Sequence, residues 1–151
     1  MHQDSYWMQR CLQLAKKASV LGEVPVGACI VVGDQCIADG FNQPITTNNP
    51  CGHAEIIALM AAGQKLQNYR LTKATIFVTL EPCLMCFGAM VHARVARLVY
   101  STKDNKVGLF SSGELDLLVG RLNHTMQISS GILAKESELL LKNFFKEKRK
   151  K

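Results

Sequence analysis

The 151-residue chain has no run of eighteen apolar residues, so it is not expected to span a membrane. Its first residues, M-H-Q-D-S-Y-W, contain no basic segment followed by an apolar one, so we expect no signal peptide and a cytoplasmic location. The chain also lacks internal repeats, low-complexity tracts and linkers, and its length predicts a single domain over residues 1–151. Hydrophobic residues make up 48% of the chain and are spread along it, which argues against global disorder.

Six cysteines are present, and in a cytoplasmic chain of this length they indicate metal binding better than disulfides. Cys11, Cys29 and Cys36 lie in apolar stretches, so we predict that these three are small buried hydrophobes.

The net charge of +6 is unevenly distributed: residues 1–50 carry −1, residues 51–100 carry +3 and residues 101–151 carry +4. A basic excess of this kind suits a polyanionic partner. Charge alone, however, favours the simpler interpretation of a solvated surface.

Hydrophobic periodicity predicts helices that alternate with strands. In order, the chain is expected to form a helix over 5–21, a hairpin around Gly33-Asp34, a loop over 42–52, a helix from His53, a strand over 74–80, a helix over 83–93, a strand over 96–100, a short helix over 114–120, a strand over 125–128 and a helix from about 132. Such alternation indicates an α/β layered domain with helices on both faces of one sheet.

Two short stretches carry candidate chemistry: His53-Ala54-Glu55, and Pro82-Cys83-Leu84-Met85-Cys86. They form the pattern H-x-E…P-C-x-x-C, which is typical of zinc-dependent nucleobase deaminases. A catalytic zinc uses three nitrogen or sulfur ligands and leaves a fourth position for water, and His53, Cys83 and Cys86 supply three such ligands. Glu55 is close to the metal without being needed as a ligand, so it can carry a proton between that water and a substrate.

The placement of the ligands on helix starts supports this interpretation. Cys83 and Cys86 are three residues apart and share one helix face, and the positive end of a helix favours thiolate over thiol. The second motif also follows the carboxyl end of a predicted strand directly, which is where α/β sheets place their sites. Backbone N–H groups near Ala54 and Cys83 are candidates for orienting a base and water.

Two other interpretations of the cysteines stay open. A C-x-x-C pair can be a redox pair, although the thioredoxin-like context that favours it is missing here. Cys51 lies two residues before His53 and can complete a Cys3His structural site. The protein would then be an interaction domain stabilised by zinc, and not an enzyme. In that case Glu55 would have no chemical role.

Further stretches extend the pattern over nearly the whole chain: E-V-P-V-G-A at 23–28, F-N-Q-P-I at 41–45, H-A-E-I-I-A-L at 53–59, N-Y-R-L at 68–71, A-T-I-F-V-T-L-E-P-C-L-M-C-F-G-A-M at 74–90, and a late G-I-L-A with paired Phe144-Phe145. With these, the chain resembles the bacterial tRNA-specific adenosine deaminases, within the cytidine deaminase-like superfamily. The metal motif alone marks only the superfamily, whereas T-L-E-P-C-x-M-C-x-G-A-M and N-Y-R-L narrow the resemblance.

The resemblance implies a three-layer α/β/α sandwich with a central five-stranded mixed sheet, and a homodimer. It implies conversion of the wobble adenosine in a tRNA anticodon stem-loop to inosine. One Zn2+ per subunit would be held by His53, Cys83 and Cys86, with Glu55 as the proton shuttle.

The resemblance also implies contacts to the substrate. Asn42 corresponds to a loop asparagine that contacts the target nucleoside, and Val26 and Leu80 correspond to apolar residues of the base pocket. The pair Asn123-His124 corresponds to residues near the RNA-binding surface. Lys103, Lys106 and the basic tail K-E-K-R-K-K are candidates for phosphate contacts.

The chain departs from the family after a K-D-x-K-x-G core, where Leu109 and Phe110 replace smaller residues in the part that would meet the anticodon loop. Two rival functions stay open. One is a deaminase of a free base or nucleoside of the guanine or cytosine type. The other is a catalytically silent RNA-binding subunit, which would be expected to lack Glu55.

Overall fold

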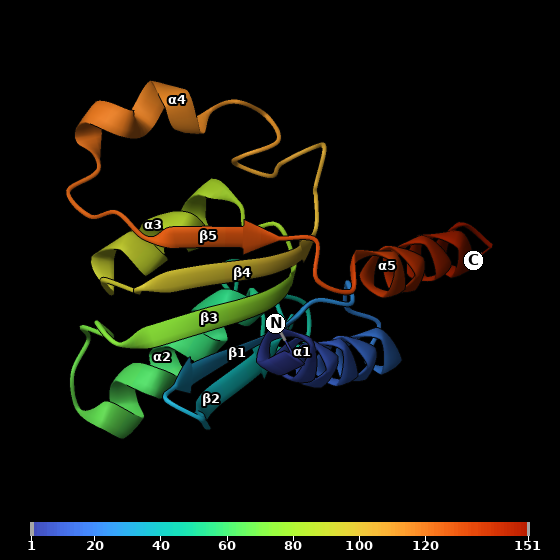
Figure 1. Cartoon of the computed structure of the whole chain (residues 1–151). Helices are drawn as coiled ribbons and strands as arrows, with labels where there is room; N and C mark the ends of the chain where they lie inside the picture. The colour runs from blue at the N-terminus through green and yellow to red at the C-terminus, as the bar shows by residue number, and fades with distance from the viewer. Residues whose placement is uncertain (1, 151) are drawn as a thin grey trace.

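The computed structural model describes residues 2–150 and consists of a five-stranded sheet covered by helices on both faces (Figure 1). Along the chain the elements are α1 (His2–Val20), β1 (Gly27–Val32), β2 (Gln35–Phe41), α2 (Ala54–Leu66), β3 (Ala74–Leu80), α3 (Leu84–His92), β4 (Arg97–Thr102), α4 (Leu115–Leu118), the 3-10 turn η1 (Val119–Arg121), β5 (Gln127–Ser130) and α5 (Ala134–Arg149). The strand order is β2-β1-β3-β4-β5. Strand β1 is antiparallel to β2 and β3, whereas β3, β4 and β5 run parallel, which confirms the predicted mixed sheet.

The sheet separates two apolar cores, and the alternation of side chains along β3 shows how. Ile76 and Val78 belong to the core shared with α2 and α3, whereas Phe77 belongs to the core under α1. Since β3 has buried residues on both faces, its continuous apolar sequence is explained by its central position. Figure 1 shows α1 in front of the sheet, α2 and α3 behind it, and α5 to the right, beyond the ends of the strands.

The first helix agrees with its prediction, apart from its start. It begins at His2 and ends at Val20, and Gly22 follows with a φ of +80°. Five residues recur at helical spacing on its predicted apolar face and all are buried: Trp7, Cys11, Leu14, Ala15 and Ala18.

The last third of the chain shows the larger differences. Strand β5 begins at Gln127 instead of residue 125, because its parallel pairing with β4 starts opposite Arg97. The helix predicted over 114–120 is divided into the four-residue α4 and η1. The basic tail is an exposed part of α5 as far as Arg149.

Of the three cysteines predicted to be buried, Cys11 and Cys29 are fully buried but Cys36 is only partly so. Cys36 lies on β2, which forms one edge of the sheet, and this position leaves its side chain partly accessible. Within residues 2–150, no helix combines the length and the apolar character needed to cross a membrane.

Two glycines allow helices to approach the sheet closely. A Cβ added at Gly27 would lie 2.1 Å from the carbonyl oxygen of Cys11 in α1, and one at Gly40 would lie 2.8 Å from the carbonyl oxygen of Ala54 in α2. Both distances are far below van der Waals contact, so only glycine fits. The contact at Gly40 fixes the start of α2 against β2, and that start adjoins His53 and carries Glu55.

We predict that Gly27→Ala destabilises the fold by about 1–3 kcal/mol, because the new methyl group forces α1 away from β1. Gly88→Ala is a matched control, because a Cβ at Gly88 meets no atom within 4 Å. Replacing that helical glycine should leave stability unchanged or raise it by up to about 1 kcal/mol. Urea unfolding of both variants measures the difference, and equal stability of Gly27→Ala and the parent protein would contradict the packing argument.

Candidate metal centre

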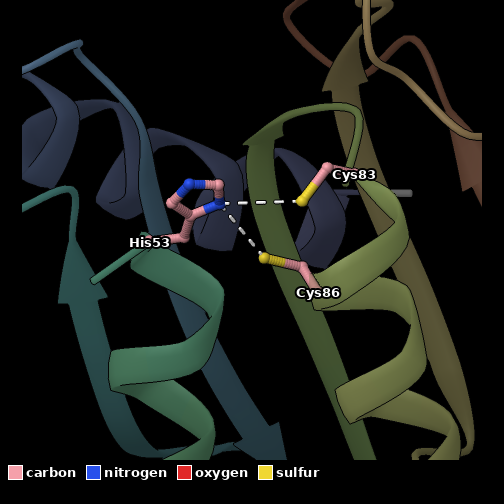
Figure 2. Close-up of side chains that lie close together, drawn as sticks. All are labelled: His53, Cys83 and Cys86. Carbon is pink, nitrogen blue, oxygen red and sulfur yellow. Dashed lines mark hydrogen bonds between the residues drawn. The ribbon is translucent and has the colours of Figure 1, made fainter. Parts of the chain in front are cut away.

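Two helix starts on the same face of the sheet bring three metal-ligating side chains together. His53 is the residue before α2, Cys83 is the residue before α3, and Cys86 lies in the first turn of α3. Figure 2 shows the imidazole facing both sulfur atoms across the gap between the two helices. Helices α2 and α3 are also in contact with each other, so the ligands are held by packing as well as by the chain.

The distances between the ligand atoms fit a tetrahedral zinc ion. The Nδ1 atom of His53 lies 3.7 Å from Sγ of Cys83 and 3.4 Å from Sγ of Cys86. With Zn–N near 2.0–2.1 Å and Zn–S near 2.3 Å, a nitrogen and a sulfur on one tetrahedral ion are about 3.5 Å apart. The residues therefore have the donor chemistry and the spacing that zinc requires, with one coordination position left open.

The electrostatics of the cluster also suit a cation. Hydrogen bonding from Cys86, supported by His53, lowers the pKa of the Cys83 thiol to about 4. The same thiol pair raises the pKa of Cys86, and Cys83 raises the pKa of His53. One sulfur is therefore a thiolate at neutral pH, and thiolate is the form that binds zinc.

Glu55 lies in the first turn of α2 and is only 4% exposed. Burial raises the pKa of its carboxyl group to about 7, with the nearby His53 acting in the opposite direction. A carboxyl group that titrates near neutrality can both accept and return a proton, which is the property predicted for this residue from its sequence position.

A cavity of about 110 Å³ adjoins the ligands. The predicted residues that line it are Val26, Asn42, His53, Glu55, Leu80 and Cys83. These residues come from the loop before β1, the end of β2, the two helix starts and the end of β3, so the fold brings together groups that are up to 57 positions apart in the sequence. Val24, Glu81, Asp104 and Val107 complete the lining and were not predicted.

Asn42 has a defined structural contact. Its Oδ1 atom accepts a hydrogen bond from the backbone N–H of Ala54 at 2.9 Å, at the first residue of α2. The Ala54 N–H, predicted to help orient a base or water, is paired with Asn42 in this structure, and its contact to a substrate stays a prediction. The side-chain amide of Asn42 remains at the cavity, where its NH₂ group can donate.

Asn123 and His124 are not at this cavity. Asn123 accepts a hydrogen bond from Arg94, and the His124 ring lies 2.7 Å from the carbonyl oxygen of Val95. Both partners precede β4, whereas the ligands follow the carboxyl end of the parallel strand β3. The pair is thus at the opposite end of the sheet from the metal centre.

The two lysines predicted to bind phosphate lie nearer to the cavity than Asn123 and His124 do. Lys103 and Lys106 are exposed on the segment that follows β4, beside the cavity-lining residues Asp104 and Val107. Leu109 and Phe110 do not line the cavity. Leu109 is 1% exposed and Phe110 packs inward between Phe87 and Tyr100, with ring centroids 5.3 and 5.6 Å away.

Cys51 is exposed and stands apart from the cluster. Among the residues that the structure describes, the group able to share one metal ion consists of His53, Cys83 and Cys86. The Cys3His interpretation is therefore not supported, and three protein ligands are the number that catalytic zinc sites use.

Two buried carboxylates escaped the sequence analysis. Glu23 accepts hydrogen bonds from the backbone N–H groups of Ile45 and Thr46 and from the Thr46 hydroxyl, and Glu81 accepts them from the loop after β4. Burial raises the pKa of Glu23, but these hydrogen bonds outweigh it and hold that pKa below its usual value. For Glu81, its position between a buried strand and Pro82 was the available signal.

Comparison with known proteins agrees with this geometry. Residues 1–102 match the family described as the cytidine and deoxycytidylate deaminase zinc-binding region. A tRNA-specific adenosine deaminase of Haemophilus influenzae is 44% identical over 147 residues, which covers 97% of this chain and 85% of the relative.

Two solved structures share the fold. One, from a study of A-to-I editing by tRNA:A34 deaminases at the wobble position, has a TM-score of 0.86 and 35% identity, covering 90% of this chain and 99% of its own. A guanine deaminase from Nitrosomonas europaea has a TM-score of 0.78 at 23% identity, covering 93% and 83%, which shows the fold alone.

Fold and ligand cluster together define a deaminase domain with a zinc-binding region. Within that class, the chain belongs to the family of tRNA-specific adenosine deaminases.

We predict that Cys86→Ala lowers the zinc content to a small fraction of that of the parent protein and also reduces stability, because the ligand and the core share α3. Glu55→Gln is the matched control, because it alters a neighbouring buried group that is not a ligand, and it should retain zinc. Metal analysis of both purified proteins gives the result. Normal zinc in Cys86→Ala would show that this ligand is wrongly assigned.

Proposed function

We propose that this protein is a zinc-dependent enzyme that hydrolytically deaminates the wobble adenosine of a tRNA anticodon to inosine, with one Zn2+ per subunit. The observation that carries the proposal is that Glu55 lines one small cavity together with His53 and Cys83, two members of the ligand cluster that Cys86 completes. The relatives named as tRNA-specific adenosine deaminases support adenosine in tRNA as the substrate. We propose that the whole chain, residues 1–151, acts as one domain.

Each group at the cavity has a role in the proposed reaction. Zinc bound to the three ligands would lower the pKa of a coordinated water to about 7. Glu55 takes up the proton that this water releases and delivers it to ring N1 of the base, so that the 6-carbon becomes electrophilic and forms a bond to the water's oxygen. Glu55 then takes the proton of the new 6-hydroxyl group and passes it to the amine, so that the C–N bond breaks, ammonia leaves and the 6-oxo group of inosine remains.

The cavity walls position the base. Val26 and Leu80 provide apolar surface for a flat aromatic ring, and the Asn42 amide offers a polar contact to the nucleoside. A target base must leave its stack to enter such a cavity, and this costs least in a single-stranded loop. An anticodon loop is therefore a more favourable substrate than a duplex.

We expect contacts to the rest of the RNA where positively charged side chains are exposed near the cavity. Lys103 and Lys106 are exposed beside the cavity, so they are suited to bind phosphates next to the target nucleotide. Asn123 and His124 lie at the other end of the sheet, so a contact to RNA there would require a longer part of the substrate or a second subunit. A tRNA substrate would place the enzyme in the cytoplasm.

A direct experiment is inosine formation in an anticodon stem-loop with a wobble adenosine, measured beside free adenosine, guanine and cytidine. We expect the zinc-loaded protein to form inosine only in the RNA. Glu55→Ala should retain zinc and lose at least about 10²-fold in rate, because the proton carrier is removed.

Turnover only on a free base would move the protein to the rival class of small-molecule deaminases. A near-normal rate for zinc-replete Glu55→Ala would contradict the proton-shuttle role.

We also propose that the protein is a homodimer. A groove of about 540 Å³ between α2 and α3 is lined mainly by apolar groups, including Ile56, Leu59, Met60 and Tyr69. Met60 and Tyr69 are 65% and 67% exposed. Apolar side chains gathered in this way are typical of surfaces that a partner covers.

Sedimentation should therefore give twice the chain mass of 16.7 kDa. Met60→Glu should shift the protein toward a monomer, because it places a charge in the apolar contact. Leu117→Glu is a control at another exposed apolar residue, which lies on α4 and is 81% exposed. Dissociation of both variants, or of neither, would argue against the α2–α3 surface.

A further inference from the structure

One wall of the catalytic cavity is an irregular segment. Residues 103–113 follow β4 without forming a helix or strand, yet Asp104 and Val107 line the cavity and Lys103 and Lys106 stand beside it. The segment is called the wall loop below. The loop has turn hydrogen bonds within itself, such as that from the Gly108 N–H to the carbonyl oxygen of Asp104. It needs further contacts to hold its place against the sheet, because ordering each residue costs about 1–2 kcal/mol of conformational entropy.

Glu81 supplies those contacts from the inside. It lies between β3 and the ligand segment Pro82-Cys83 and is 3% exposed. Its Oε1 atom accepts from the backbone N–H of Asp104 at 3.1 Å and from the Ser111 hydroxyl. Its Oε2 atom accepts from the backbone N–H groups of Phe110 and Ser111 at 2.7 and 2.8 Å.

We propose that Glu81 is a positioning residue, which holds the wall loop closed against the catalytic cavity so that Asp104 and Val107 meet the substrate in a fixed geometry. This inference rests on the proposed RNA deaminase function for its kinetic consequence. Its structural consequence, the order of the wall loop, is independent of that function.

The contacts of Glu81 are directed at the loop instead of at a cation. Among residues 2–150, no ion pair includes Glu81. Its four donors come from both ends of the loop, Asp104 on one side and Phe110 with Ser111 on the other. A single side chain therefore closes the segment into a ring of backbone, from which Val107 reaches the cavity.

Two further features fix the loop around the same carboxylate. Gly108 passes so close that an added Cβ would lie 2.4 Å from Cδ of Glu81 and 2.4 Å from the carbonyl oxygen of Asp104. The N–H of Leu109 donates to the carbonyl oxygen of Pro82 at 3.2 Å, and the Leu109 side chain is buried. The loop is thereby attached to the segment that carries the ligand Cys83.

The geometry makes Glu81→Gln an informative substitution. Each carboxylate oxygen faces at least one backbone N–H, so either orientation of the amide directs an NH₂ group at a donor. The loop would then lose contacts at one end, while size and shape at position 81 are kept.

In steady-state deamination of the anticodon stem-loop, we expect Glu81→Gln to raise KM about tenfold and to change kcat less than about threefold. Zinc content should stay normal. Hydrogen exchange of the 104–111 amides should become faster, while exchange in β3 and β4 stays unchanged. If Glu81→Gln instead lowered kcat and the overall stability while hydrogen exchange in the wall loop stayed unchanged, Glu81 would have only a general structural role. That result would overturn the proposal.

Neighbouring serines provide a matched control. Ser111→Ala removes the hydroxyl that donates to Glu81, whereas Ser112→Ala removes one that donates to the carbonyl oxygen of Leu109 within the same loop. Ser111→Ala should reproduce part of the KM increase and Ser112→Ala should not. Equal effects of the two would contradict a specific role of Glu81.

A second pair of variants tests the close approach of Gly108 to Glu81 without changing the carboxylate itself. Gly108→Ala should increase KM and loop exchange as Glu81→Gln does, whereas Gly120→Ala, whose Cβ would meet no atom within 4 Å, should do neither. If the parent protein deaminates no RNA, the proposed function fails, while the exchange measurements still decide whether Glu81 orders the wall loop.

Discussion

The metal centre depends on the packing of two helix starts against one face of the sheet. A zinc ion tolerates only a few tenths of an ångström in the separation of its ligand atoms, yet His53 and the cysteine pair are thirty residues apart and belong to different helices. Close contact of α2 with β2 at Gly40 fixes one ligand, and the direct passage from β3 into α3 fixes the others. The separation of the ligand atoms therefore depends on how the helices pack against the sheet in the hydrophobic core.

Around this centre, the cavity is walled by irregular backbone. The loop after β2 surrounds the buried carboxylate of Glu23, and the loop after β4 surrounds that of Glu81. A buried carboxylate is costly unless its oxygens are fully hydrogen-bonded, and loop N–H groups are costly unless they find acceptors. The loop N–H groups donate to the buried carboxylates, so both sets of polar groups are hydrogen-bonded. Both loops can therefore be ordered without forming secondary structure.

The sequence predicted the centre well because its chemistry is local. The spacing of His53 with Glu55, and of Cys83 with Cys86, depends on short-range helix geometry, and the continuous apolar run of β3 predicted a strand with the observed limits. Strand β5 was misplaced by two residues because its limits come from pairing with β4, which no local pattern encodes. The roles of Glu23 and Glu81 were missed for the same reason, since their partners are more than twenty residues away.

The wall loop separates two kinds of residue. Leu109 and Phe110 face the core and attach the loop, whereas Asp104 and Val107 face the cavity. Substitutions at the cavity-facing positions can alter the surface that a substrate meets while the anchors keep the backbone in place. The same scaffold can therefore accommodate new substrates by changes at a few positions. The division lets the surface facing the cavity vary independently of the contacts that attach the loop to the core.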